Sequence, residues 1–233
     1  MNQEEVGRYD QMRARYRATV VQRGLREDTA WGQPYDALNV QAWASPPLKD
    51  HVGLLQEELK QLLPADTRYV PVDRLHISVA CLLEGRSGGR PENASRWEKI
   101  GAECLESLRD VCARARPARI RFERVLSTDV AVLLVGRDGG ELDVLRRCIG
   151  DLMTGCGLEY RPKEIIHCTV ARGGPTPGNG AELLHWADER YIDVEEFVGG
   201  VDVLWEWTYP SLATTTEARL ELAGPLPRPD RPS

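Results

Sequence analysis

The sequence predicts a bilobal α+β fold of duplicated strand–helix–strand units, with two antiparallel-type sheets lining a central cleft and helices outside. Residues 76–79 read His-Ile-Ser-Val and residues 167–170 read His-Cys-Thr-Val, so one four-residue pattern occurs twice. Each of these tetrads lies in an apolar segment that ends a strand–helix–strand run. Because a duplicated unit builds the same supersecondary structure twice, the two runs indicate two related lobes.

The first run begins with an apolar strand at residues 38–43 and a Ser-Pro-Pro turn at residues 45–47. A helix is expected next, because apolar residues recur there at helical spacing. They are Leu54, Leu55, Leu59, Leu62 and Leu63. The run ends in a strand that we expect over residues 69–83, and this strand contains His76.

The second run repeats this order, with a strand at residues 131–135 and an Arg-Asp-Gly-Gly turn at residues 137–140. Its helix carries an apolar stripe of Leu142, Leu145, Ile149, Leu152 and Met153. The next strand contains His167. Both tetrads are followed by a glycine-rich stretch and another helix, so a duplication explains the pattern better than a chance likeness between two units. A pseudo-twofold arrangement would bring the tetrads to face each other across a cleft.

The remaining segments complete a domain that we expect over residues 36–226. Periodicity and end signals predict helices at residues 95–115 and 181–191 and strands at residues 119–126, 194–209 and 217–222. The strand at 194–209 contains Gly199-Gly200, where it can break. Residues 227–233 are rich in proline and polar side chains and are expected to form a disordered tail.

Residues 1–35 precede the repeat and are expected to form a helical extension. Tyr9, Met12, Tyr16 and Val20 make an apolar stripe at helical spacing, and arginines surround it. Such a helix can simply dock on the body with a solvated arginine face. It can also guide an anionic substrate, and the sequence leaves both readings open.

Composition limits the classes of function. The 233 residues are 42% hydrophobic and 28% charged, as in an ordinary globular protein. The net charge of −6 argues against binding of long duplex nucleic acid, which needs a basic face. The six cysteines form no Cys-x-x-Cys pair, which favours free thiols in a reducing compartment. With no apolar signal segment or membrane-length run, we expect a cytoplasmic monomer.

The tetrads place an imidazole and a hydroxyl on the same face of a strand. Alternate strand residues share a face, so His76 lies beside Ser78 and His167 beside Thr169. Two of only four histidines in the chain head the tetrads. His51 and His185 lie in predicted helices without such partners.

Two such pairs suit cleavage of a phosphodiester, in which attacking and leaving oxygens lie on opposite sides of phosphorus. One histidine can take a proton from water while the other gives one to the leaving oxygen. Ser78 and Thr169 can donate hydrogen bonds to the non-bridging phosphate oxygens. No metal or other cofactor is predicted, because the tetrads offer too few ligands for a zinc site. A structural domain with two buried histidines is the plain alternative.

The pattern resembles the two-histidine (2H) phosphoesterase superfamily, which includes the bacterial 2′-5′ RNA ligase and cyclic phosphodiesterase families. Their shared feature is a pair of His-x-Thr/Ser-x motifs in a bilobal α+β fold. In the ligase-like branch the second motif continues into Ala-Arg, as Ala171-Arg172 do here. The first motif departs mildly, because Ser78 stands where Thr is commoner.

The resemblance implies metal-independent hydrolysis of 2′,3′-cyclic or 2′-5′ phosphodiester bonds, with a small nucleotide or an RNA end as substrate. By the usual family assignment His76 is the base and His167 the acid. Two alternatives remain: hydrolysis of a cyclic oligonucleotide signal, and a non-catalytic module that only binds nucleotide or phosphate.

Four further residues are weaker candidates. Strict alternation puts Arg172 on the strand face opposite His167, so it reaches a bound phosphate only if the strand ends or bulges there. Trp205, Trp207 and Tyr209 alternate onto one face and can stack on a base, although packing against a helix is the better explanation.

Overall fold

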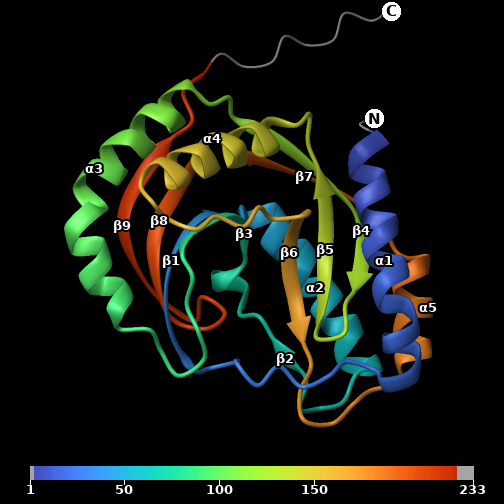
Figure 1. Ribbon diagram of the computed structural model, residues 1–233. Helices are drawn as coiled ribbons and strands as arrows, with labels where there is room; N and C mark the ends of the chain where they lie inside the picture. The colour runs from blue at the N-terminus through green and yellow to red at the C-terminus, as the bar shows by residue number, and fades with distance from the viewer. Residues whose placement is uncertain (1–2, 225–233) are drawn as a thin grey trace, which may run out of the picture.

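The computed structural model describes residues 3–224, and the predicted tail at 227–233 lies outside them. The expected α+β architecture is confirmed (Figure 1). The helices are α1 (Gln3–Arg23), α2 (Pro46–Leu62), α3 (Glu92–Arg114), α4 (Glu141–Gly155), α5 (Gly180–Glu189) and a short 3₁₀ helix at Val72–Arg74. The strands are β1 (Pro34–Trp43), β2 (Arg68–Tyr69), β3 (His76–Leu83), β4 (Ala118–Ser127), β5 (Ala131–Arg137), β6 (Ile166–Arg172), β7 (Tyr191–Val198), β8 (Gly200–Thr208) and β9 (Ala213–Glu221).

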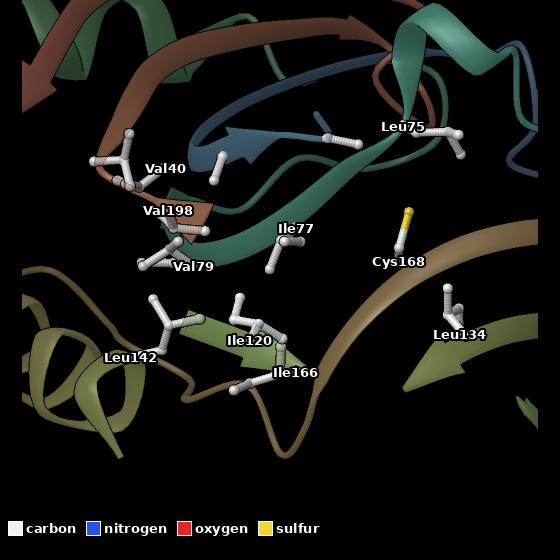
Figure 2. Close-up of a cluster of buried hydrophobic side chains, with 14 of the residues drawn as sticks. Val40, Leu75, Ile77, Val79, Ile120, Leu134, Leu142, Ile166, Cys168 and Val198 are labelled. Carbon is white, nitrogen blue, oxygen red and sulfur yellow. The ribbon is translucent and has the colours of Figure 1, made fainter. Parts of the chain in front are cut away.

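The strands form two antiparallel halves that meet at one point. Their order is β7-β4-β5-β6-β3-β1-β8-β9, and β2 pairs with β6 off this path. The halves β7-β4-β5-β6 and β3-β1-β8-β9 join through the pairing of Ile77 with Cys168. Both side chains are fully buried in the core drawn in Figure 2. The two tetrads therefore lie next to each other where the halves of the sheet meet.

Helices α2 and α4 connect the two halves of the sheet, because each packs against strands of the half to which its preceding strand does not belong. Helix α4 follows β5 in the chain but packs against β3 of the other half. Helix α2 follows β1 and packs against β6 and β7. Each strand–helix–strand unit thus buries the apolar side of its helix partly against its partner unit, which orders the junction that carries the tetrads.

Helix starts are set by short local signals. Helix α2 begins with Pro46, whose missing N–H costs nothing at the first helical position. The Asp138 carboxylate accepts hydrogen bonds from the backbone N–H groups of Gly140 and Leu142 at the start of α4. Gly140 has a φ of 97°, a conformation that a side chain would strain.

The same irregularity occurs in both tetrad strands. In the β1–β3 pair, Val40 faces Ala80 and Gln41 faces Ser78, so Val79 is an extra residue in β3. In the β5–β6 pair, Val132 faces Ala171 and Leu133 faces Thr169, so Val170 is extra in β6. A bulge shifts the alternation by one residue. Residues 81 and 172 therefore return to the face that carries the histidines.

One predicted strand was wrong, and another breaks at the position that its sequence allows. The segment 69–83 is not one strand: Pro71 has no N–H to give to a ladder, a 3₁₀ turn follows, and β3 begins only at His76. The segment 194–209 breaks at Gly199, and its parts β7 and β8 lie in opposite halves of the sheet.

Helix α1 is docked on the half β7-β4-β5-β6. It packs against α5 and β4, and the Tyr9 hydroxyl donates to the Val125 carbonyl at 3.1 Å. Arg13 and Arg17 pair with Asp188 of α5 at 2.6 and 3.1 Å. No helix within residues 3–224 is long and apolar enough to cross a membrane. The six cysteines are free thiols.

Candidate active site

The polar residues of both tetrads line one cleft, a cavity of about 520 Å³ at the junction of the two halves. His76, Ser78, His167 and Thr169 all contribute to its wall and are half-buried. Their intervening residues Ile77 and Cys168 point into the core, so alternation turns the imidazoles and hydroxyls outward. The cleft thus holds two imidazole–hydroxyl pairs, one from each half.

Each imidazole ring is influenced by the backbone carbonyl two residues before it. Nδ1 of His76 lies 2.9 Å from the carbonyl oxygen of Arg74, and since a carbonyl only accepts, Nδ1 donates. This tautomer leaves the Nε2 lone pair of His76 available to take a proton. The carbonyl of Ile165, also two residues upstream, raises the pKa of His167. Nδ1 of His167 nevertheless makes no hydrogen bond within the described residues.

Both imidazoles are neutral at pH 7. Burial, aided by the positive charges of Arg172 and Lys163, lowers the pKa of His76 to about 4. Burial, aided by Lys163 and by His76 itself, lowers the pKa of His167 to about 3. A positive charge on His76 would lower the pKa of His167 further, so the two rings lie within electrostatic reach of each other. A site that disfavours positive charge on its histidines while holding nearby cations is suited to an anion.

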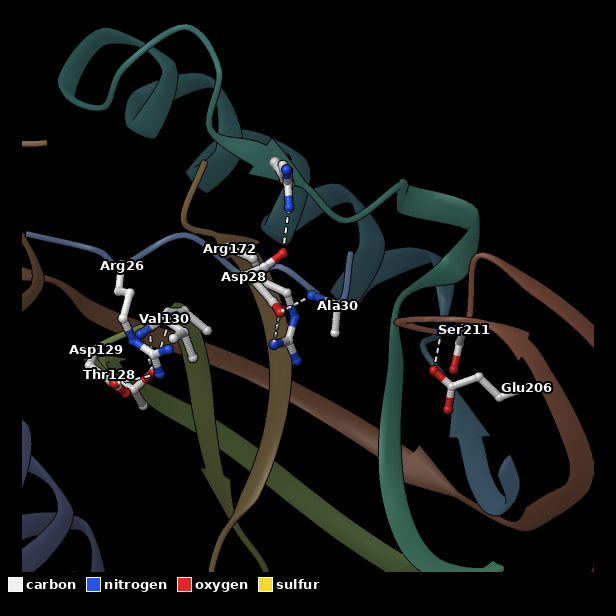
Figure 3. Close-up of polar contacts among 11 residues, drawn as sticks. Arg26, Asp28, Ala30, Thr128, Asp129, Val130, Arg172, Glu206 and Ser211 are labelled. Carbon is white, nitrogen blue, oxygen red and sulfur yellow. Dashed lines mark hydrogen bonds and ion pairs between the residues drawn. The ribbon is translucent and has the colours of Figure 1, made fainter. Parts of the chain in front are cut away.

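Arg172 also lines the cleft, because the bulge at Val170 returns it to the histidine face. Its guanidinium pairs with Asp28 at 2.7 Å (Figure 3). It also lies over the Tyr209 ring, 4.8 Å from the centroid. Asp28 lies between α1 and β1, and Arg68 donates to its carbonyl oxygen. The N-terminal extension therefore supplies the carboxylate that orients Arg172.

The structure corrects the expectation of base stacking for Trp205 and Trp207. Their rings stack on each other with centroids 5.1 Å apart, and neither lines the cleft. Glu206, between them in β8, does line it, so strand alternation turns both tryptophans to the opposite face. Tyr209 lies beyond the end of β8 and does reach the cleft, where its ring is 4.8 Å from that of Tyr35.

Glu206 and Lys163 are cleft residues that the sequence did not reveal. The Glu206 carboxylate accepts hydrogen bonds from the side chain of Asn39 at 2.5 Å and the backbone N–H of Ser211 at 2.7 Å. Burial raises its pKa. A charged residue between two tryptophans in a strand is the signal that could have found it. Lys163 lies in a loop with no periodic pattern, so no signal pointed to it.

Arg146 of α4 is a buried support of both tetrads. Its guanidinium donates to the carbonyls of Val79 and Ser78 at 3.2 and 3.1 Å and to that of Ile165 at 3.4 Å. One side chain thereby holds the backbones of both histidine strands. Its position on the apolar stripe of the predicted helix, beside Leu145, is the sequence signal of this buried role.

The free energy of unfolding is expected to fall as the pH drops below about 6.5. Unfolded histidines take up a proton near pH 6.5. The folded protein takes one up only near the lowered pKa values, about 4 for His76 and about 3 for His167. Between these values the unfolded chain binds more protons, so acid favours unfolding. At pH 5 the loss is on the order of 2 kcal/mol for each histidine.

Urea unfolding at pH 7 and pH 5 measures this effect. We expect the His76→Gln/His167→Gln protein to lose less stability between the two pH values than the parent protein does. His185→Gln serves as the control, because the side chain of His185 is 72% exposed and lies outside the cleft. Equal pH dependence of the parent and the double variant would contradict the neutral, buried state of the two rings.

Comparisons with known proteins give a match only at the level of structure. No protein-family model matches the chain, and no curated protein does. TT0787 of Thermus thermophilus matches with a TM-score of 0.57 at 16% identity, over 81% of this chain and 98% of its own. Escherichia coli LigT matches with a TM-score of 0.53 at 13% identity, over 81% and 98%. A structure described as a phosphoesterase matches with a TM-score of 0.53 at 14% identity, over 80% and 98%.

LigT has also been solved with small nucleotides. Its complexes with 3′-AMP and NADP⁺ match this chain with TM-scores of 0.50 and 0.51 at 14% identity, over 81% of this chain. At these identities the comparison concerns architecture alone. The chain shares the fold of these proteins, as expected from the resemblance that its paired tetrads indicated.

Proposed function

We propose that the protein is a metal-independent phosphodiesterase that hydrolyses 2′,3′-cyclic or 2′-5′ phosphodiester bonds of a small nucleotide or an RNA end. The observation that carries this proposal is the convergence of His76 and His167, one from each half of the sheet, on a single cleft. The nucleotide complexes of LigT, a protein with the same fold, support a nucleotide as the ligand.

The two histidines would act on opposite sides of one phosphorus atom. His76 is neutral, and its Nδ1–H is held by the Arg74 carbonyl, so Nε2 can take the proton from the attacking water. His167 would give a proton to the leaving oxygen. Ser78 and Thr169 would hold the non-bridging oxygens, where negative charge accumulates.

The acid role needs a protonated imidazole, which burial in the cleft disfavours. The negative charge of the substrate phosphate opposes the two causes that lower the histidine pKa values, namely burial and the cations of Lys163 and Arg172. Substrate binding is therefore expected to raise the pKa of the histidine nearest the leaving oxygen. Arg172 would add a charge-assisted hydrogen bond to the phosphate from the position set by Asp28.

A substrate panel tests the proposal. Purified protein is assayed against 2′,3′-cyclic mononucleotides, 2′-5′-linked dinucleotides and cyclic dinucleotides, each with and without a chelator. Turnover of a cyclic mononucleotide or a 2′-5′ dinucleotide that survives the chelator supports the proposal. Loss of that turnover in the chelator would overturn the metal-independent mechanism.

The panel also separates the two alternatives. Turnover confined to cyclic dinucleotides would indicate hydrolysis of a signalling nucleotide by the same residues in a differently shaped cleft. Tight binding without turnover would indicate a nucleotide-binding module. In either case the proposed reaction would be wrong, while the assignment of the cleft as a nucleotide site would stand.

A further inference from the structure

A flanking cavity of about 410 Å³ lies beside the cleft, between α1, α4 and the loop before β6. The two cavities share Pro162 and Lys163 as lining residues. The two cavities therefore adjoin each other at these two residues. Nothing in the proposed reaction at the two histidines uses this space.

The flanking cavity is cationic although the chain carries a net charge of −6. Its cations are Arg8, Arg15, Arg146, Arg147 and Lys163, against the two carboxylates of Asp143 and Glu164. Asp143 is already neutralised, because Arg8 and Arg146 contact it at 2.7 and 3.4 Å. The excess positive charge therefore belongs mainly to Arg15, Arg147 and Lys163.

These cations are available to a ligand. Arg147 is exposed, and no ion pair or hydrogen bond involves it within the described residues. Arg15 lies 3.5 Å from Glu164, but both side chains are 57% exposed, so this surface pair is weak and can be exchanged for a phosphate. Lys163 influences both cleft imidazoles electrostatically, so its charge lies within reach of the cleft as well.

Helix α1 contributes two arginines, Arg8 and Arg15, to the flanking cavity. Arg8, Gln11 and Arg15 recur at helical spacing and line the flanking cavity. On the other side of the helix, Arg13 and Arg17 bind Asp188 of α5. Arg13 and Arg17 therefore bind α1 to α5, while Arg8 and Arg15 line the flanking cavity.

We propose that the flanking cavity binds a second phosphate of a short oligonucleotide whose scissile phosphate lies between the two histidines. This inference rests on the proposed phosphodiesterase function and narrows its substrate from a mononucleotide to a chain. An oligonucleotide fits the charge pattern because consecutive phosphates would lie in two adjacent cationic spaces joined by Lys163.

The test compares a 2′,3′-cyclic mononucleotide with a trinucleotide that ends in a 2′,3′-cyclic phosphate. The variant is Arg15→Ala/Arg147→Ala; Lys163 is left intact because it also lines the cleft. Arg109→Ala/Arg116→Ala is the matched control, since it removes the same charge from exposed positions outside both cavities. Fluorescence anisotropy with a labelled trinucleotide measures binding in parallel with the kinetics.

We expect the Arg15→Ala/Arg147→Ala protein to show a KM for the trinucleotide raised by about tenfold, with kcat unchanged. Its KM for the mononucleotide should equal that of the parent. The dependence of trinucleotide binding on salt should become shallower by about 0.7 in log–log slope for each lost phosphate contact. An equal change for both substrates, no change, or the same change in the control would overturn the inference.

The anisotropy measurement tests the second phosphate site independently of whether the proposed reaction occurs. If neither substrate is turned over, the phosphodiesterase proposal fails, and anisotropy still decides the second site. Weaker trinucleotide binding in the Arg15→Ala/Arg147→Ala protein than in the parent and the control would then support the site. Equal binding by all three proteins would refute it.

Discussion

Alanine in place of His76 or His167 is expected to lower kcat/KM on the preferred nucleotide substrate by about 10²–10⁴-fold, the usual contribution of a general acid or base. Both rings line the same cleft, so they can act on one phosphate. In the proposed mechanism, Nε2 of His76 takes the proton, since its Nδ1 is engaged by the Arg74 carbonyl. Among the described residues no other histidine lines the cleft, so no second imidazole can substitute.

Steady-state kinetics on the single and double variants measure the effect. Residues that act together in one step lose activity non-additively, so the double variant should fall only slightly below the worse single variant. The pH profile of kcat/KM should lose one limb in each single variant. His185→Ala should retain parental kinetics. A variant at either tetrad histidine that keeps more than about a tenth of the parental rate would contradict paired acid–base catalysis.

Arg146→Ala is expected to lower the free energy of unfolding by about 3–5 kcal/mol, because each buried carbonyl that loses its donor costs about 1–3 kcal/mol. The residue is 2% exposed and donates hydrogen bonds to the carbonyls of Ser78, Val79 and Ile165. Its loss leaves these three acceptors short of a donor and removes one partner of Asp143. Lysine cannot restore the interaction, because an ammonium lacks the planar fork that reaches several carbonyls.

Thermal denaturation followed by circular dichroism measures this change, and a fall in Tm of about 10 °C is expected for a chain of this size. Arg147→Ala is the matched control: it is the next residue on the helix, is exposed, and should change the unfolding free energy by less than about 0.5 kcal/mol. Equal stabilities of the two variants would show that Arg146 does not support the junction of the tetrads.

Local sequence patterns predicted several features of the fold. Apolar stripes at helical spacing predicted α2 and α4, and the alternation of His76 with Ser78 and of His167 with Thr169 predicted which side chains share a face. The duplication of the run predicted two related halves. Prediction was poorest where local rules conflict, because Pro71 interrupts an apolar segment that otherwise resembles one strand. The Gly199-Gly200 pair indicated the break between β7 and β8, but not that these strands lie in opposite halves of the sheet.

A β-bulge makes side-chain alternation an unreliable guide to which face of a strand a residue occupies. Strict alternation turns Arg172 away from His167, yet the extra residue Val170 returns it to the cleft. The same rule correctly applied to Trp205 and Trp207 puts them on one face, but it does not say which face borders the cleft. That depends on the pairing of β8 with β1 and β9, which is a long-range property.

By itself the sequence determined the chemistry available: two imidazole–hydroxyl pairs at matching places in a repeated unit, because side-chain alternation and helical periodicity are local properties of the backbone. Only the tertiary structure decided that the pairs share one cleft. The Ile77–Cys168 contact, the Arg146 hydrogen bonds and the approach of Asp28 to Arg172 join residues far apart in the chain. Burial of both rings, and hence their lowered pKa values, follows from that packing and from no single segment.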